Sequence, residues 1–117
     1  MKINQYQEEA KRTLASTGSR LADELHMAMG MVTEAGELID VYKKNLAYKK
    51  EIDYVNLKEE LGDILWYIAN LCNINDWDIE DVLEININKL KVRYPEKFTQ
   101  ENAINRNLEE ERKTLEQ

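Results

Sequence analysis

The sequence is poor in residues that break or cross-link a chain. Its 117 residues include one proline, four glycines and one cysteine. A single cysteine cannot form an intramolecular disulfide, and a chain with a single proline can contain long uninterrupted helices. We therefore expect a reduced chain built from a few long elements, with Cys72 buried as a small apolar residue.

Long apolar runs and an excess of basic residues are also absent. No segment approaches the roughly 20 apolar residues that a membrane span needs, and the beginning of the chain lacks the apolar segment of a secretory signal. The formal net charge is -7, which disfavours binding to a nucleic-acid backbone. We expect a soluble, cytoplasmic protein that binds neither membrane nor nucleic acid.

What the sequence does contain is helical periodicity almost throughout, without strand-like alternation. It predicts an all-α fold, a bundle of four to five helices that forms a single domain over residues 1–117, with 108–117 as a charged C-terminal tail. The helices are expected over residues 3–15, 21–47, 57–74 after an N-cap at Asn56, 79–94 after an N-cap at Asp78, and a short stretch after an N-cap at Thr99.

The helix expected over residues 21–47 has two apolar faces. One stripe has steps of four and three residues and consists of Leu21, Leu25, Ala28, Val32, Ala35, Ile39, Tyr42 and Leu46. The opposite side carries Met27, Met31, Leu38 and Val41, and Glu34 and Glu37 lie among them. We expect a central helix that packs on both sides and keeps its acids away from the surface.

Two pairs of acids stand out, and each pair lies on one face of a predicted helix. They are Glu34-x-x-Glu37 and, on the next helix, Glu60-x-x-Asp63. Two packed helices could direct all four carboxylates to one spot, where repulsion would leave most of them neutral unless a cation were present. Oxygen ligands without histidine or thiolate indicate Mg²⁺, or else Mn²⁺.

Polar residues on the neighbouring rows could serve a phosphate ligand. Asn86, Lys89 and Arg93 lie on or beside the buried line of the fourth predicted helix, where apolar residues are expected. Tyr67 shares the row of Glu60 and Asp63 and is a candidate for contacting the substrate. Each acidic pair alone could be a solvated helix face, but two pairs among apolar residues together with a basic row favour a site. Carboxylates that hold a divalent cation, together with basic residues that bind phosphate, are typical of phosphoryl transfer.

These motifs resemble those of the MazG-like nucleotide pyrophosphohydrolases, which belong to the all-α nucleoside triphosphate pyrophosphatase superfamily. The resemblance covers residues from about 20 to 107 and rests on "GMVTEAGELIDV", "LKEELGDILWYIANL", "NINKLKVRYPEKF" and "AINRN". Many relatives begin the first motif with two adjacent acids, whereas Thr33 precedes Glu34 here.

The resemblance implies a Mg²⁺-dependent enzyme that cleaves nucleoside triphosphates between the α- and β-phosphates. It implies that Glu34, Glu37, Glu60 and Asp63 bind the metal, and that one of them or Glu59 activates the water. Substrate contacts would come from Asn86, Lys89 and Arg93. The site is often completed by another subunit, which implies a homodimer or homotetramer.

Two other hypotheses compete with this one. A ferritin-like di-iron bundle needs Glu-x-x-His motifs, and the chain has one histidine. A catalytically silent helical dimer, acting as a regulatory or partner-binding module, would use the acids structurally. It predicts no stabilisation by divalent metal.

Overall fold

The computed structural model describes all residues from 1 to 117 and contains helices but no strands. The chain forms two compact units, Met1–Trp77 and Asp78–Gln117. The all-α prediction is confirmed, but the expected four to five helices are six because part of the tail is also helical. None of the helices combines the length and apolar character that spanning a bilayer would require.

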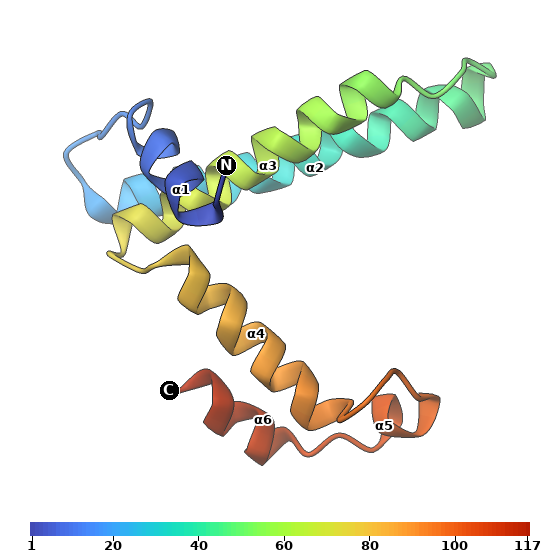
Figure 1. The fold of residues 1–117 in the computed structure, drawn as a ribbon. Coiled ribbons are helices and arrows are strands. Elements are labelled where there is room, and N and C mark those ends of the chain that lie inside the picture. Colours follow the sequence, from blue (N-terminus) through green and yellow to red (C-terminus); the bar gives the residue numbers. More distant parts are fainter. The chain divides into compact units, whose positions relative to one another are not determined.

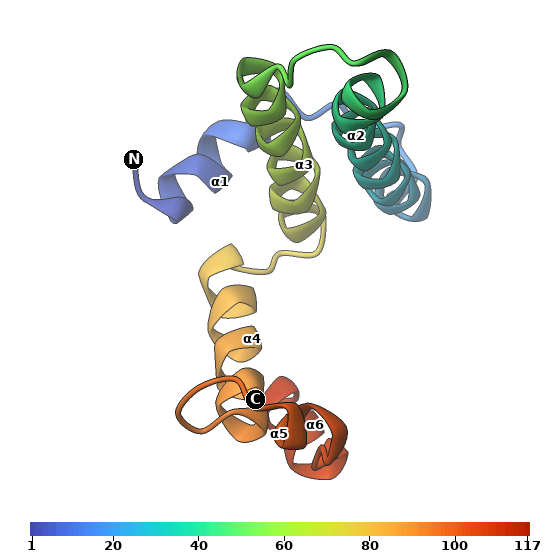
Figure 2. The same cartoon turned by 90° about the vertical axis from the view of Figure 1, so that its right-hand side faces the viewer.

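The first unit is an antiparallel helical hairpin with a third helix packed against it. Helices α2 (Arg20–Tyr48) and α3 (Tyr54–Ile74) lie side by side along their length, and α1 (Ile3–Lys11) packs on α3 (Figures 1 and 2). The Ser19 hydroxyl caps α2 by accepting from the Ala22 N–H. The expected cap at Asn56 is wrong, because α3 begins earlier and Asp53 caps it by accepting from the Asn56 N–H.

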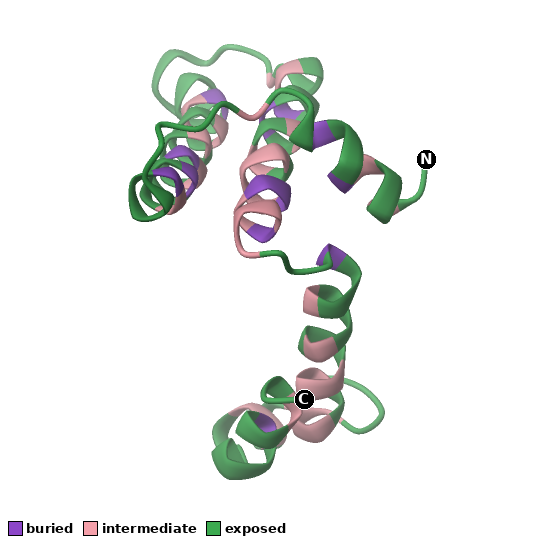
Figure 3. Ribbon diagram, turned by 90° about the vertical axis from the view of Figure 1, so that its left-hand side faces the viewer, coloured by how far each residue is buried: buried purple, intermediate pink, exposed green.

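The core of this unit lies between α2 and α3 and between α3 and α1 (Figure 3). Its buried apolar residues are Ala10, Met27, Val41, Leu57, Ala69 and Cys72. The expected burial of Cys72 as a free cysteine is confirmed. Where α1 meets α3 the contact is polar: the Gln7 amide donates to Asn73 at 3.0 Å, and the Asn70 amide donates to the Ala10 carbonyl at 3.1 Å.

The second apolar face of α2 is not covered within the chain. Leu21, Val32, Ile39 and Leu46 expose 68% or more of their surface, so the expectation of a helix packed on both sides is wrong for the isolated chain. Helix α3 also has uncovered apolar residues, since Leu61 and Leu65 are exposed. The periodicity identified apolar faces correctly, but only one face of α2 has a partner here.

The second unit contains α4 (Ile79–Arg93), α5 (Gln100–Ile104) and α6 (Leu108–Leu115). The predicted caps at Asp78 and Thr99 are confirmed, since their side chains accept from the Glu80 and Asn102 N–H groups. Helix α4 ends before Pro95, as proline restricts the residue that precedes it. The expected tail over 108–117 is mostly α6, which packs on α4.

Candidate metal centre

Three of the four predicted metal ligands meet between α2 and α3. Glu34, Glu37 and Glu60 each offer a carboxylate oxygen, and these oxygens lie within 4.8 Å of one another. Glu60 is buried at 4% exposure, Glu34 is half-buried and Glu37 is exposed. The cluster therefore runs from the helix interface to the surface. The expectation that both acids of α2 lie away from solvent is wrong for Glu37.

The spacing of the acids and the packing of the helices explain this meeting. Glu34 and Glu37 are three residues apart on α2 and so share one face. That face also carries Met27 and Val41, whose burial turns it toward α3. Glu60 lies one turn after the buried Leu57 on α3. The apolar contacts thus hold the carboxylates together against their mutual repulsion.

The close approach of the three carboxylates perturbs the pKa of Glu60. The pKa of Glu60 is raised from 4.5 to about 7, first because a proton on Glu60 can be shared in a hydrogen bond with Glu34. Burial and the nearby Glu37 carboxylate raise the pKa further. Near neutral pH a proton thus relieves the repulsion among the three acids.

The donor set fits a divalent cation with a preference for oxygen. The Oε2 atoms of Glu34 and Glu60 are buried and accept no hydrogen bond. A buried acceptor without a partner is costly, and either a proton or a cation can supply that partner. Because the set contains no histidine or cysteine, it suits Mg²⁺ or Mn²⁺ better than zinc.

Asp63, the fourth predicted ligand, lies outside the group of three. Its side chain is exposed one turn beyond Glu60, and its charge contributes to the raised pKa of Tyr6, after burial of that phenol. The Tyr6 hydroxyl donates to the Gly62 carbonyl at 3.3 Å. Asp63 as a metal ligand stays a prediction.

Tyr67 is positioned by a glycine on the facing helix. A Cβ atom at Gly30 would lie 2.1 Å from Cε1 of Tyr67, so the ring occupies the space that any side chain at this position would fill. Trp66 makes an edge contact with the ring at 5.0 Å between centroids, and His26 lies at 6.2 Å. Since Gly30 precedes Glu34 by one turn, the ring lies against the part of α2 that leads into the cluster.

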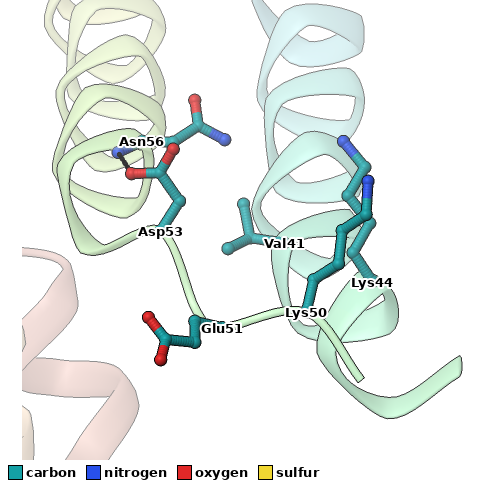
Figure 4. Close-up of a pocket in the computed structure, with 6 residues that line it drawn as sticks. All are labelled: Val41, Lys44, Lys50, Glu51, Asp53 and Asn56. Atoms are coloured by element: carbon teal, nitrogen blue, oxygen red, sulfur yellow. Dashed lines mark hydrogen bonds between the residues drawn. The ribbon is translucent and has the colours of Figure 1, made fainter. Parts of the chain in front are cut away.

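A shallow pocket opens at the looped end of the hairpin, one turn beyond the cluster on each helix. Its volume is about 240 Å³, and its lining includes Val41 and Lys44 of α2, Asn56 of α3 and Lys50 of the connecting loop. Figure 4 shows the two lysine amines on the α2 side and Asp53 and Asn56 on the α3 side. This pocket was not predicted from the sequence, because its lining depends on the conformation of the loop.

The predicted substrate-binding residues Asn86, Lys89 and Arg93 all lie on α4, in the second unit. Asn86 is exposed and Lys89 is half-buried. Arg93 has a partner that the sequence did not suggest, since its Nη2 donates to Oε1 of Glu111 on α6 at 2.7 Å. Glu111 stands in a run of three glutamates, so nothing in the local sequence marks it as the buried one.

The fold and the cluster define an all-helical protein with a candidate metal centre of carboxylates held between two packed helices. The model of the MazG nucleotide pyrophosphohydrolase domain matches residues 22–98, so the chain belongs to this family. The Gene 37 protein of Mycobacterium phage L5 is 33% identical over 114 residues, covering 91% of this chain and 100% of the phage protein. No solved structure gives a significant match.

Proposed function

We propose that this chain is a Mg²⁺-dependent nucleoside triphosphate pyrophosphohydrolase, for which Mn²⁺ can substitute. It would convert a (d)NTP to the monophosphate and pyrophosphate by cleavage between the α- and β-phosphates. The observation that carries the proposal is the cluster of Glu34, Glu37 and Glu60, with two buried oxygens that have no partner, in a chain of the MazG nucleotide pyrophosphohydrolase family.

In this proposal the carboxylates of Glu34, Glu37 and Glu60, together with Asp63, hold the metal. Bound Mg²⁺ would neutralise charge on the phosphates and orient water for attack. Occupation of the site requires Glu60 to lose its proton, because a carboxylate binds metal only in its charged form. Either one of these carboxylates or the exposed Glu59 would accept the proton of the attacking water.

The remaining predicted residues would bind the nucleotide. Lys89 and Arg93 carry the positive charge that a triphosphate needs, and Asn86 offers an amide for phosphate or sugar. Tyr67 presents an aromatic ring against Gly30, one helical turn before Glu34 on α2. These roles support binding and orientation of the substrate, on which phosphoryl transfer largely depends.

The proposal is tested by measuring pyrophosphate release from a panel of canonical and modified NTPs and dNTPs, with Mg²⁺ and with EDTA. The variants are Glu37→Gln and, as a matched control, Glu8→Gln, which changes an exposed acid on α1. We expect Mg²⁺-dependent release that is lost in Glu37→Gln and kept in Glu8→Gln. Absence of turnover on every nucleotide, with folded protein, would instead favour a silent regulatory module.

We also propose that the uncovered face of α2 is the contact surface of a homodimer or homotetramer. This surface comprises Leu21, Leu25, Ala28, Val32, Ala35, Ile39, Tyr42 and Leu46, all of them exposed. A continuous apolar stripe on a soluble helix is typical of a helix-packing seam, and a second copy brings an identical stripe to it. We therefore expect a second copy of this chain to cover this surface.

Sedimentation of Ile39→Glu tests this surface directly, because the substitution places a charge at the middle of the stripe. We expect Ile39→Glu to sediment as a monomer while the wild-type chain and the control Lys58→Glu, a charge reversal at an exposed site on α3, remain associated. An unchanged mass for Ile39→Glu would remove the stripe as the contact surface.

A further inference from the structure

The second unit contains one strongly polar cluster, formed by Arg93, Arg106 and Glu111. Glu111 is 2% exposed, although it belongs to a charged helix near the end of the chain. Its Oε1 accepts from Arg93 Nη2 at 2.7 Å and from Arg106 Nη2 at 2.9 Å, and its Oε2 accepts from Arg106 Nε at 3.1 Å. A single buried carboxylate thus orients two guanidinium groups.

The charges of this two-arginine cluster do not cancel. Two arginines share one carboxylate, which leaves a net positive charge in a chain whose formal charge is -7. Lys89 lies four residues before Arg93 on α4 and therefore on the same face. If fixing α6 to α4 were the only role, one arginine would neutralise Glu111 and the second would be superfluous.

The two guanidinium groups also have N–H donors that Glu111 does not use. Each guanidinium carries five N–H bonds, and Glu111 accepts one from Arg93 and two from Arg106. The Nε atom of Arg93 is buried and donates to no acceptor, while the Arg106 side chain keeps 39% exposure. Arg106 therefore presents donors that Glu111 does not use, beside a second guanidinium that adds positive charge, and this combination binds phosphate oxygens.

We propose that Glu111 is a positioning residue that holds Arg93 and Arg106 together as a binding site for a polyphosphate anion, with Arg106 as a phosphate-binding residue. The inference rests on the proposed function in one respect, since the polyphosphate would be that of the nucleotide. It assigns Glu111 an indirect role: the carboxylate fixes both guanidinium groups before the anion arrives, so that less side-chain freedom is lost on binding.

The direction in which Glu111→Gln changes anion affinity distinguishes positioning of the arginines from simple neutralisation of their charge. Glu111→Gln removes a negative charge, so if the carboxylate merely offset the arginines, the variant would bind anions more tightly. If the carboxylate positions them, the variant binds anions more weakly despite its more positive charge. Glu110→Gln is the matched control, because Glu110 is the neighbouring residue of α6 and pairs with Lys113 at an exposed site.

The experiment is calorimetric titration of the full chain with inorganic pyrophosphate in EDTA, so that the carboxylate cluster binds no metal. We expect Arg106→Gln to weaken binding by about tenfold or more, as for loss of a charged hydrogen bond. Glu111→Gln should weaken it in the same direction, and Glu110→Gln should leave it unchanged. Arg106→Gln keeps the Arg93–Glu111 pair and so guards against a folding defect that removal of Glu111 could cause.

Tighter binding by Glu111→Gln, unchanged binding by Arg106→Gln, or no binding of pyrophosphate by the wild-type chain would each overturn the inference. Nucleotide turnover is measured in parallel to separate this inference from the proposed function. Pyrophosphate binding that depends on Arg106, without hydrolysis of any nucleotide, would uphold the anion site and refute the proposed enzyme. Hydrolysis whose KM is the same in Arg106→Gln and the wild-type chain would do the opposite.

Discussion

The close approach of Gly30 to Tyr67 allows a prediction whose magnitude follows from the structure. In Gly30→Ala, the new Cβ would lie 2.1 Å from Cε1 of Tyr67 and 2.4 Å from its Cζ. The ring cannot swing away freely, because Trp66 and His26 border it. Overpacking of this kind costs about 1–3 kcal/mol, while alanine in a helix interior gains about 1 kcal/mol over glycine.

Gly36 provides the matched control. It lies in the interior of the same helix, but a Cβ there would meet no atom within 4 Å. Both variants receive the same gain in helix propensity, so the difference between their free energies of unfolding isolates the overpacking. We expect Gly36→Ala to be stabilised by up to about 1 kcal/mol, and Gly30→Ala to fall about 1–3 kcal/mol below it.

Urea unfolding followed by circular dichroism measures both values, at one fixed protein concentration because association also affects apparent stability. Removal of the ring should abolish the difference, so that Gly30→Ala made in a Tyr67→Ala background becomes neutral or stabilising. Equal stabilities of Gly30→Ala and Gly36→Ala would refute the reasoning. In the proposed enzyme, displacement of Tyr67 should also raise KM for the nucleotide.

Three further predictions follow from the charged groups. Because the folded-state pKa of Glu60 is raised to about 7, the free energy of unfolding of the metal-free protein should fall as pH rises from about 4.5 through about 7. This fall should be smaller in Glu60→Gln. An equal fall in the variant and the wild-type chain would contradict the raised pKa. Mg²⁺ at about 100 times its Kd should stabilise the wild-type chain by about 2.7 kcal/mol in a thermal-shift assay, and the same gain in Glu37→Gln would count against the cluster as the binding site. The pKa of Glu111 is lowered to about 2, first by the hydrogen bond from Arg106. Its contribution to the free energy of unfolding should therefore be present above about pH 4.5 and fade as pH falls toward 2. In acid unfolding, the stabilities of the wild-type chain and Glu111→Gln should converge over this range, and a constant difference between them would refute the lowered pKa.

The sequence was sufficient to predict α2 and the common face of Glu34 and Glu37, because short-range rules determine both. Helix α2 was expected over 21–47 and spans Arg20–Tyr48. The spacing of Glu34 and Glu37 fixes their common face, and the apolar residues around them turn that face toward α3. Once the helices pack, Glu60 must lie near them. Whether Asp63 joins the metal site depends on side-chain positions that spacing alone does not specify.

Other features depended on choices between equivalent residues. Asp53 and Asn56 both have N-cap chemistry, and the structure selects Asp53. Glu109, Glu110 and Glu111 are indistinguishable in sequence, yet only Glu111 is buried, because α6 turns it toward Arg93. The apolar stripe of α2 was visible in the periodicity, but periodicity carries no information on whether the covering helix comes from the same chain or from a second one.

The proposed reaction of this chain is cleavage of nucleoside triphosphates between the α- and β-phosphates at the carboxylate cluster. Phosphorus NMR of one reaction, with a nucleotide that the panel identifies as a substrate and Mg²⁺, resolves the products and tests this most directly. We expect signals of the nucleoside monophosphate and pyrophosphate with the wild-type chain, and intact triphosphate with Glu60→Gln. Nucleoside diphosphate and inorganic phosphate as the products, or equal conversion by Glu60→Gln, would contradict it.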